Sequence, residues 1–398
     1  MFQRNLFFSL LLLGLATAGK AQFQIEGRVL NAKTSQPIPF LSLGIKNTGL
    51  GTLTNEQGEF VLKVAQLPVV IITSHLSYQT AEIKITKSDG NEIRLTEAVH
   101  NLTEVKVTNL AEKLLRQAYE KNWANRKELV HGNAFYRQTT KTDDEYTELH
   151  EVFYAFKINS MAVQGLKIKQ ARYAKIKSTT EKPTFTFLNL SYAVWAYNGK
   201  AQKTKLALDR IIIPCRADVA DYFDLTINDI TTNQDQEIYE IECKPRAGNP
   251  PGQYFSGRVF INRATSNILK IEGDLGNGGV SGQGFENAKM TFDYRFRELP
   301  AGFSVLDYGK VVFTGNLSAG KKPKVITQAT LVLHETGEDF KEKSLKKLNI
   351  NKEDLAEILK IKYDPEFWKN NPIIKRTTQE DQIIKSFEGK NAFGSILE

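Results

Sequence analysis

Two long stretches of this chain, residues 23–107 and about 133–334, are dominated by short segments in which apolar and polar residues alternate. Residues 23–29 and 60–64 are examples from the first stretch, and residues 238–243 are an example from the second. A period of two places the apolar side chains of a strand on one face. The 27 glycines and 12 prolines suit the turns that separate such strands. The sequence therefore predicts a mainly β protein.

The amino terminus, residues 1–21, has the pattern of a cleaved secretory signal. Arg4 precedes a short apolar run, residues 6–15, which is shorter than the about 20 residues that a membrane-spanning helix needs. Gly19 and Ala21 are the small residues at positions −3 and −1 of the cleavage site. The alternative is a buried or membrane-anchoring amino-terminal helix. We expect an exported mature chain with no transmembrane segment, in the periplasm, associated with the outer membrane, or secreted.

Residues 22–107 predict a compact β-sandwich of about 85 residues. Turn signals separate its alternating segments at residues 31–37, 49–51 and 55–58. Residues 69–73 are mostly β-branched, and such a run suits a strand that is buried on both faces.

Four short motifs of this sandwich stand in the order of a known family. They are Gly27-x-Val29 and residues 37–40, 51–55 and 58–60. They resemble the carboxypeptidase-regulatory-like domain, a transthyretin-like sandwich common in exported Bacteroidetes proteins, and residues 102–107 look like its closing strand. Gly51 and Gly58 lie where hairpins need a positive φ. The resemblance implies no peptidase site, and it implies an outer-membrane or other envelope protein as partner.

Residues 108–340 predict an α+β domain in which one helix precedes a large antiparallel sheet. One face of the helix carries Leu110, Leu114, Leu115, Ala118, Tyr119 and Trp123. Core packing is the interpretation of the two aromatic residues among these, and a ligand cage is the alternative. The alternation in the following strands suits a sheet that this helix covers on one side.

The turn Asn262-x-x-Thr265-x-x-Ile268 joins two alternating segments of this sheet. This pattern resembles the curved half-barrel sheets of periplasmic lipoprotein carriers. It is also similar to the uncharacterised domain that follows the regulatory-like module in many Bacteroidetes envelope proteins. The resemblance implies a half-barrel whose concave apolar face would hold an acyl chain or a similar ligand, bound through burial of apolar surface.

Residues 341–398 predict a helical tail that packs on the sheet domain. Asn351 is a suitable N-cap of one helix, and Asp364-Pro365 begins another with proline at the first helical position. Phe367 and Trp368 follow. As an exposed pair they would anchor a partner, whereas docking onto the chain's own sheet is the alternative that we favour.

Lys167, Lys169, Lys175 and Lys177 fall on one face of a strand with period two, which predicts a cationic stripe. The stripe would suit anionic envelope lipids or glycans. An ordinary strand edge protected by lysines is the alternative. Nucleic acid is not an expected partner, because an exported protein rarely meets it.

Cys215 and Cys243 are the two cysteines of the chain. Oxidation is permitted in an exported protein, so a disulfide between them is one interpretation. Two separate buried thiols are the other.

Motifs that carry chemistry are incomplete in this sequence. Residues 315–322 have the glycine spacing of a phosphate-binding loop, but no Ser or Thr follows Lys321, and a hairpin turn is the better interpretation. His150-Glu151 and His334-Glu335 each lack the second histidine of a zinc-protease helix. The sequence therefore predicts no catalytic residue, no metal ligand and no cofactor.

These observations favour a non-catalytic exported envelope protein that acts as a binding or adaptor module. An apolar molecule, a lipid or a glycan on the antiparallel sheet is the expected ligand. The alternatives are a periplasmic hydrolase with an unidentified site and a purely structural spacer.

We predict that the exported chain begins at Gln22. Cleavage after Ala21 would remove Arg4 and Lys20 and lower the formal charge from +8 to +6. Intact mass and amino-terminal sequencing of the protein recovered from a bacterial envelope check this prediction. An exported protein that retains residues 1–21 would contradict it and favour the anchoring helix.

Overall fold

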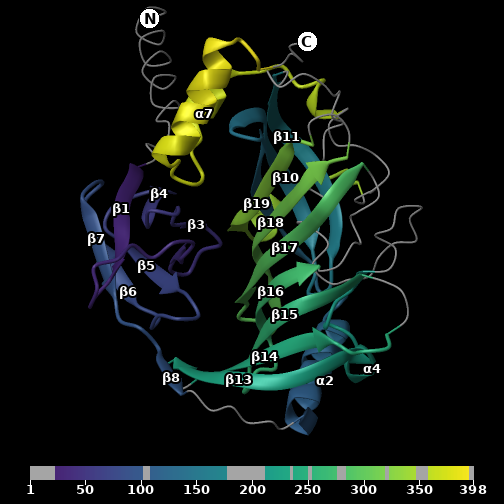
Figure 1. Ribbon diagram of the computed structural model, residues 1–398. Helices are drawn as coiled ribbons and strands as arrows, with labels where there is room; N and C mark the ends of the chain where they lie inside the picture. The colour runs from purple at the N-terminus through teal and green to yellow at the C-terminus, as the bar shows by residue number, and fades with distance from the viewer. Residues whose placement is uncertain are drawn as a thin grey trace, which may run out of the picture.

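The computed structural model describes residues 23–101, 108–176, 211–233, 236–249, 253–275, 284–318, 322–346 and 357–393. The predicted signal at 1–21, the predicted closing strand at 102–107, Lys177 and the predicted N-cap Asn351 lie outside these residues. The described chain is mainly β, as predicted (Figure 1). It forms a sandwich of two small sheets, one large sheet and a few helices.

The sandwich has two sheets with an apolar core between them. One sheet has the strand order β4 (Glu59–Val64), β1 (Phe23–Asn31) and β7 (Asn91–Leu95). The other has the order β3 (Gly51–Leu53), β2 (Ser42–Ile45), β5 (Val69–Ser74) and β6 (Glu82–Ile85). Ile25 and Phe60 from the first sheet share a buried core with Leu43 and Ile71 from the second. The predicted sandwich is confirmed.

Two details of the sandwich differ from the sequence predictions. Gly58 has the predicted positive φ, 72°, but Gly51 does not, because it begins the extended strand β3. A Cβ at Gly51 would lie 2.9 Å from the carbonyl oxygen of Leu43, so the close approach of β2 explains this glycine. In β5, Ile71 and Thr73 are buried while the alternate positions are not, because one face of this sheet lies outside the core.

Within the described residues, the large sheet has 12 strands and is almost entirely antiparallel. The order along it is β11–β10–β9–β19–β18–β17–β16–β15–β14–β13–β8, and β12 pairs with β15. The strands are β8 (Val99–Asn101), β9 (Val130–Thr142), β10 (Glu145–Ile158), β11 (Val163–Lys175), β12 (Ile211–Ile212), β13 (Phe223–Asn233), β14 (Gln236–Pro245), β15 (Gln253–Asn262), β16 (Ile268–Leu275), β17 (Phe285–Glu298), β18 (Ser304–Leu317) and β19 (Lys324–Thr336). Figure 1 shows that the sheet is curved. Its edge strand β8 directly follows the sandwich in the sequence and pairs with β13.

One face of the large sheet, called here the helix face, carries the main apolar core. Tyr154, Ile241 and Phe313 lie in this core together with Leu114 and Leu115 of helix α2 (Thr108–Ala124). α2 packs mainly against β13 and against the short helix α4 (Val219–Tyr222). The predicted cover of the sheet by the preceding helix is therefore confirmed.

The end of α2 departs from the sequence interpretation. Trp123 is 41% exposed, so the expectation that it packs in the core is wrong. Its ring stacks on Tyr119, with a centroid distance of 6.4 Å, and the Arg126 guanidinium lies 4.4 Å from its centroid. In the last turn of the helix, Trp123 and Ala124 are exposed, whereas the carbonyl oxygen of Asn122 accepts from the Ser160 hydroxyl at 2.7 Å.

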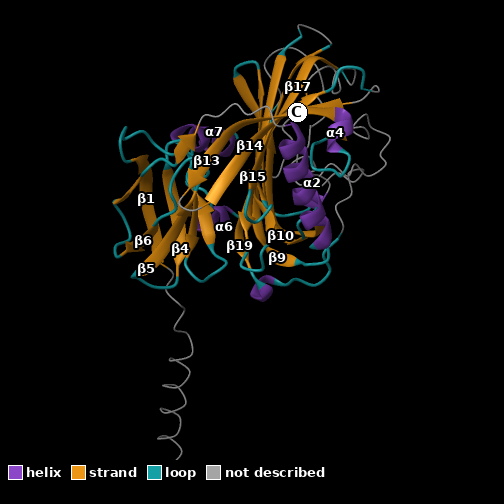
Figure 2. Cartoon of the chain, turned by 90° about the horizontal axis from the view of Figure 1, so that it is seen from below, coloured by secondary structure: helices purple, strands orange, loops and turns teal. Residues whose placement is uncertain are grey.

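The opposite face, called here the domain face, carries a row of polar and charged residues that crosses the sheet from β11 to β14. In register, the row contains Arg172, Glu151, Arg137, Thr330, Lys310, Asp293, Glu272, Arg258 and Glu242. Opposite charges on adjacent strands attract one another. Figure 2 shows the sandwich on one side of the sheet and α2 on the other.

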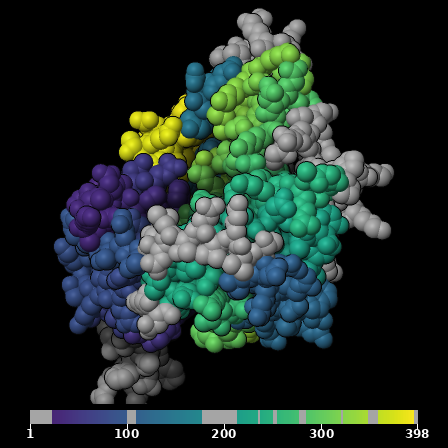
Figure 3. Space-filling model, turned by 60° about the horizontal axis from the view of Figure 1, so that its bottom comes forward, coloured from purple at the N-terminus to yellow at the C-terminus, as the bar shows by residue number. Residues whose placement is uncertain are grey.

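The C-terminal segment also packs on the domain face. It contains the helices α6 (Pro365–Asn370) and α7 (Thr378–Gly389), after the single turn η2 (Glu338–Phe340). Asp364 caps α6 and Pro365 is its first residue, as predicted. Figure 3 shows the C-terminal segment, in yellow, between the sandwich and the sheet. None of the helices in the described ranges is long and apolar enough to span a membrane.

Hydrogen bonds to main-chain carbonyl groups of the sandwich hold it directly against the large sheet. The amide of Thr336 donates to the carbonyl oxygen of Gly49 at 2.8 Å, and Arg295 Nη1 donates to the carbonyl oxygen of Phe40 at 2.7 Å. The ring of Phe40 packs on Tyr308, with a centroid distance of 5.6 Å. A Cβ at Gly49 would lie only 1.6 Å from the Thr336 carbonyl oxygen. The docking therefore requires a residue without a side chain at position 49.

We predict that Gly49→Ala loosens the docking and lowers the free energy of unfolding by about 1–3 kcal/mol, the usual range for an overpacked contact. Gly44→Ala is the matched control, since a Cβ at Gly44 meets nothing within 4 Å. The control should leave stability unchanged or raise it slightly, because glycine weakens a strand. Urea denaturation of both variants measures the difference. Equal effects of the two substitutions would contradict the prediction.

Candidate functional site at the junction of sandwich, sheet and C-terminal segment

Two pockets lie where the sandwich, the domain face of the sheet and the C-terminal segment meet. The Arg137 pocket has a volume of about 300 Å³ and is lined by Glu56, Arg137, Tyr308 and Glu380 among others. The His334 pocket has a volume of about 430 Å³ and is lined by Lys63, Lys169 and His334 among others. Each pocket is therefore built from three parts of the chain that are far apart in the sequence.

A buried cluster of charges lies beside the Arg137 pocket. Glu151 accepts from Arg137 Nε through Oε1 at 2.6 Å and is paired with Arg172 through Oε2 at 2.5 Å. The cross-strand register places both arginines directly opposite Glu151, one on each neighbouring strand. Glu151 is 1% exposed, Arg172 4% and Arg137 7%. Charges this deeply buried need paired partners, because an isolated one would be strongly destabilising.

The cluster changes the acidity of its members. Burial alone would raise the pKa of the Glu151 carboxyl, but the guanidinium groups of Arg172 and Arg137 outweigh burial and lower this pKa from 4.5 to about 2. Burial lowers the pKa of Arg137, whereas Glu380 and Glu151 raise it by more, so its net pKa lies above the usual value. Glu151 and Arg137 are therefore charged at neutral pH.

Glu380 joins this cluster to the start of α7. Its Oε1 accepts from Arg137 Nη1 at 2.6 Å, and its Oε2 accepts from the amide of Thr377 at 2.8 Å. The Thr377 hydroxyl in turn accepts from the Glu380 amide at 3.1 Å, which completes a capping box. One carboxylate thus both caps α7 and binds the sheet.

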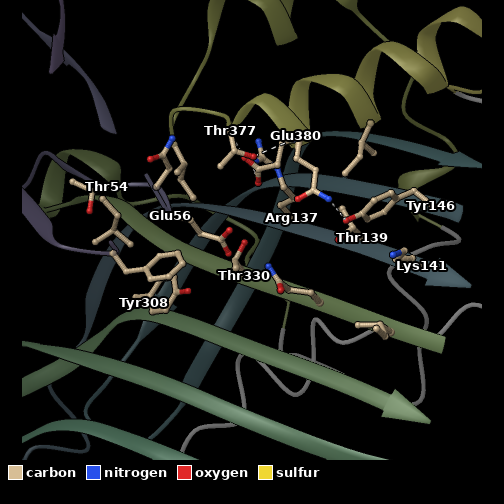
Figure 4. A pocket seen from close by; sticks show the side chains of 18 residues that line it. Thr54, Glu56, Arg137, Thr139, Lys141, Tyr146, Tyr308, Thr330, Thr377 and Glu380 are labelled. Carbon is tan, nitrogen blue, oxygen red and sulfur yellow. Dashed lines mark hydrogen bonds and ion pairs between the residues drawn. The ribbon is translucent and has the colours of Figure 1, made fainter. Parts of the chain in front are cut away.

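Polar and aromatic side chains fill the walls of the Arg137 pocket (Figure 4). The sheet contributes Thr139, Lys141 and Thr330, and Glu56 comes from the sandwich. The Tyr308 hydroxyl is buried and has no hydrogen-bond partner among the described residues. Such a lining can accept hydrogen bonds from a polar ligand and donate them to it.

A β-bulge positions His334 in the second pocket. The register between β19 and β9 shifts between Leu333 and Glu335, so His334 is the extra residue. Its ring meets Phe153 edge to face, with a centroid distance of 6.2 Å. Burial lowers the pKa of His334 to about 4, and the nearby ammonium groups of Lys169 and Lys63 act in the same direction against Glu335. The imidazole is therefore neutral at neutral pH.

The rim of the His334 pocket carries two ammonium groups from different parts of the chain. Lys63, on β4, donates to the carbonyl oxygen of Asn370 at 2.7 Å, and burial lowers its pKa. Lys169, on β11, donates to Asn133 Oδ1 at 3.4 Å. Asn133 Nδ2 donates to Glu335 Oε2 at 2.6 Å. The rim is therefore cationic on balance, with its one carboxylate held by an amide.

Aromatic rings form one wall of the same pocket and the layer behind it. Phe153 lies between Phe135, Phe367 and Trp368, with centroid distances of 5.2, 5.2 and 5.4 Å. Of these rings, Phe153 and Phe367 line the pocket itself. The pocket thus combines an apolar wall with a polar rim.

The predicted cationic stripe does not exist on one face of β11. The register with β10 shifts after Phe153, so Lys169 is an extra residue and the strand changes face around it. Lys167 pairs with Glu342 at 2.9 Å, whereas Lys175 lies on the helix face and pairs with the buried Glu148 at 3.2 Å. Lys177 lies outside the described residues. Of the three lysines that the structure describes, Lys169 is the one that lines either pocket.

The predicted partner anchor is only partly exposed. Trp368 is 7% exposed, packs on Phe153, and lies with its ring centroid 4.5 Å from the Arg172 guanidinium. The interpretation of Trp368 as an exposed anchor for a partner is therefore wrong. Trp368 docks on the chain's own sheet, which is the alternative that the sequence analysis favours. Phe367 is half-buried and lines the His334 pocket. A role for Phe367 and Lys169 in binding stays a prediction.

Cys215 and Cys243 are both free thiols in the structure, so the predicted disulfide is not present. Cys243 lies in the main apolar core, and Cys215 packs against it. Burial raises the pKa of Cys215 to about 12, so this thiol is protonated and unreactive at neutral pH. The alternative of two separate thiols agrees with this arrangement.

Sequence reasoning missed the charged cluster of Arg137, Glu151, Arg172 and Glu380. A signal was present, because Glu151 interrupts the otherwise mostly apolar and aromatic stretch 149–156. In the part of the chain that the structure describes, no group of three or more His, Cys, Asp and Glu residues is placed to hold a metal ion. His150 and Glu151, adjacent in the sequence, point to opposite faces of the sheet.

The sandwich matches a known family. Residues 25–107 match the model of the CarboxypepD_reg-like domain. The resemblance predicted for this part of the chain is confirmed, and the sandwich is called the regulatory-like domain below. A Bacteroidetes origin and the family of the sheet domain stay predictions. The comparison with curated proteins gives no match.

Two solved structures resemble the chain only distantly. One is a LolA superfamily protein from Nitrosomonas europaea, at 14% identity, covering 58% of this chain and 97% of that one, with a TM-score of 0.22. The other is MucB in complex with MucA(peri), at 11% identity, covering 58% and 95%, with a TM-score of 0.17. At these scores neither likeness supports a conclusion about fold or ligand.

We predict that Glu151→Gln lowers the free energy of unfolding at neutral pH by about 3–5 kcal/mol, because it leaves two buried guanidinium groups short of a negative charge. The folded-state pKa of Glu151, about 2, lies below its usual value of 4.5. Its contribution is therefore complete above about pH 4.5 and is lost as the pH falls toward 2. The variant should lack this part of the pH dependence.

Urea denaturation of both proteins between about pH 2 and 7 measures this effect. Glu82→Gln is the control, because Glu82 forms an exposed pair with Lys46 at 2.6 Å and should matter little. Parallel pH profiles for Glu151→Gln and the unmodified protein would contradict the role assigned to the cluster.

Proposed function

We propose that this chain is an exported, non-catalytic binding protein whose ligand occupies the junction between the regulatory-like domain, the sheet and the C-terminal segment. The observation that carries the proposal is the placement of both pockets at this one junction. Their volumes, about 300 and 430 Å³, lie in the range of small-molecule sites.

Ion pairs and hydrogen bonds hold the walls of the junction in place, and this favours binding. Glu151 holds Arg137 and Arg172 in place, and Glu380 fixes the start of α7 against Arg137. The approach of the regulatory-like domain is set by the hydrogen bond between Thr336 and Gly49. A ligand that enters such a site loses less free energy to ordering of the protein than one that must assemble it.

The position of the apolar ligand differs from the one that the sequence suggested. An acyl chain was expected on the apolar face of the sheet, but α2 packs against that face and the apolar side chains there lie in the core. The pockets lie on the domain face instead. We therefore place the ligand on the domain face.

The charged groups near the pockets favour binding over hydrolysis. Arg137, Glu151 and Glu380 are engaged in ion pairs with one another. His334 is neutral, and its Nδ1 lies 4.0 Å from Glu335 Oε2, beyond hydrogen-bond distance. A histidine that acts as a general base is usually oriented by a hydrogen bond to a third group, and Glu335 lies too far from His334 to provide one.

Export and an envelope location are part of the proposal. Residues 1–21 have the signal pattern that supports them. The regulatory-like domain would then contact an outer-membrane or other envelope protein, and the junction would hold a small ligand. Since the junction includes residues of the regulatory-like domain, ligand binding there would affect how that domain binds its partner.

Native mass spectrometry of residues 22–398, purified from a bacterial envelope without detergent, tests this proposal. We predict a bound small molecule that is released on denaturation. A chain that is empty under all conditions, and that co-purifies in stoichiometric amounts with an envelope protein, would overturn ligand binding and leave an adaptor. Turnover of a supplied ester, peptide or glycoside by the purified chain would overturn the non-catalytic assignment.

A further inference from the structure

We propose that the His334 pocket binds an amphipathic monocarboxylate, with its apolar body against Phe153 and Phe367 and its carboxylate between Lys63, Lys169 and His334. This inference rests on the proposed binding function and names the class of ligand. It depends on three features of one pocket: an apolar wall, a cationic rim and a buried imidazole with a free nitrogen.

The apolar side of the pocket is aromatic and aliphatic. Phe153 is 8% exposed and is fixed by contacts with Phe135 and Trp368, so it forms a rigid surface. Phe367 stands at 84° to it, with a centroid distance of 5.2 Å. Ile373 completes this side from the C-terminal segment. Burial of a ligand's hydrocarbon against these groups supplies the non-directional part of its affinity.

The polar side of the pocket favours one negative charge. Lys63 and Lys169 contribute two positive charges, and Glu335 contributes one negative charge that the Asn133 amide holds at 2.6 Å. Glu342, the other carboxylate near Lys169, is engaged by Lys167 at 2.9 Å and lies 4.0 Å from Lys169. The net charge of these three side chains is +1. A monoanionic ligand neutralises this charge, whereas a dianionic ligand would leave an excess negative charge in the pocket.

The buried imidazole supplies a directional contact. His334 Nε2 is buried and has no hydrogen-bond partner among the described residues. The side chain is 8% exposed, whereas the Lys169 side chain is 43% exposed. Solvent thus reaches the lysine at the rim and not the histidine at the floor. A carboxylate that enters past Lys169 can accept from Nε2–H of the neutral ring, and this satisfies a polar atom that the protein leaves unpaired.

Sodium decanoate is the probe, and decanol is its uncharged counterpart of the same chain length. Isothermal titration calorimetry with residues 22–398 should show that decanoate binds about tenfold or more tightly than decanol. Lys169→Met and His334→Phe should each weaken decanoate binding about tenfold, which corresponds to about 1.4 kcal/mol. Neither substitution should change the affinity for decanol by more than about twofold. Lys322→Met is the matched control and should have no effect, because Lys322 lines neither pocket and forms an exposed pair with Glu286 at 2.8 Å.

Equal affinities for decanoate and decanol would overturn the inference. Decanoate binding that Lys169→Met and Lys322→Met weaken equally would also overturn it, since the site would then lie elsewhere or respond only to net charge. If His334→Phe fails to fold, Lys169→Met at the exposed rim still decides the outcome. A retained envelope ligand of another class, together with no decanoate binding, would refute this inference and leave the proposed function standing. An empty chain in both experiments would refute both.

Discussion

The carboxylate of Glu151 lies between two guanidinium groups, and through them this contact reaches both helices of the C-terminal segment. Arg172, held on one side, presents its guanidinium to the ring of Trp368 at 4.5 Å. Arg137, held on the other, reaches Glu380 and thereby the cap of α7. Each ion of the cluster is compensated only while its neighbours are present, because buried charges are stable in pairs and very unstable alone. The sheet and the segment that closes over it are therefore mutually dependent.

The large sheet uses its two faces for different purposes. Its helix face is apolar and close-packed, and it joins α2 and the strands into one core. Its domain face carries the charged row from Arg172 to Glu242. These side chains form ion pairs within the row and do not form a close-packed apolar core. The regulatory-like domain therefore docks on this face through a limited set of polar contacts and aromatic rings. The two pockets remain between those contacts, which explains why both lie at the junction.

Much of the fold could be predicted from the sequence, because it depends on local pattern. Alternation with period two predicted the strands, the motifs around Gly27 and Gly58 predicted the regulatory-like domain, and the spacing of Leu114 and Leu115 predicted the helix that covers the sheet. Less of the candidate site could be predicted. Arg137 and Glu151 share their strand faces with the apolar residues Phe135 and Phe153, which hints at burial. Nothing local shows that the carboxylate on one strand meets the arginines on its two neighbours.

Two β-bulges show the same limit at the level of single residues. Period-two reasoning placed Lys167 and Lys175 on one face, but the bulge at Lys169 separates them, and a second bulge gives His334 its position. A bulge arises from the pairing of two strands, so neither strand's own sequence determines it. The sequence by itself determined the strands and which side chains along each strand are apolar. It also determined the regulatory-like domain and the N-caps of α6 and α7. All of these features depend on residues that are close together in the sequence. The tertiary structure decided which polar residues are buried and which of them meet in a pocket, because those contacts join positions from Lys63 to Glu380 that only the docking of three separate parts brings together.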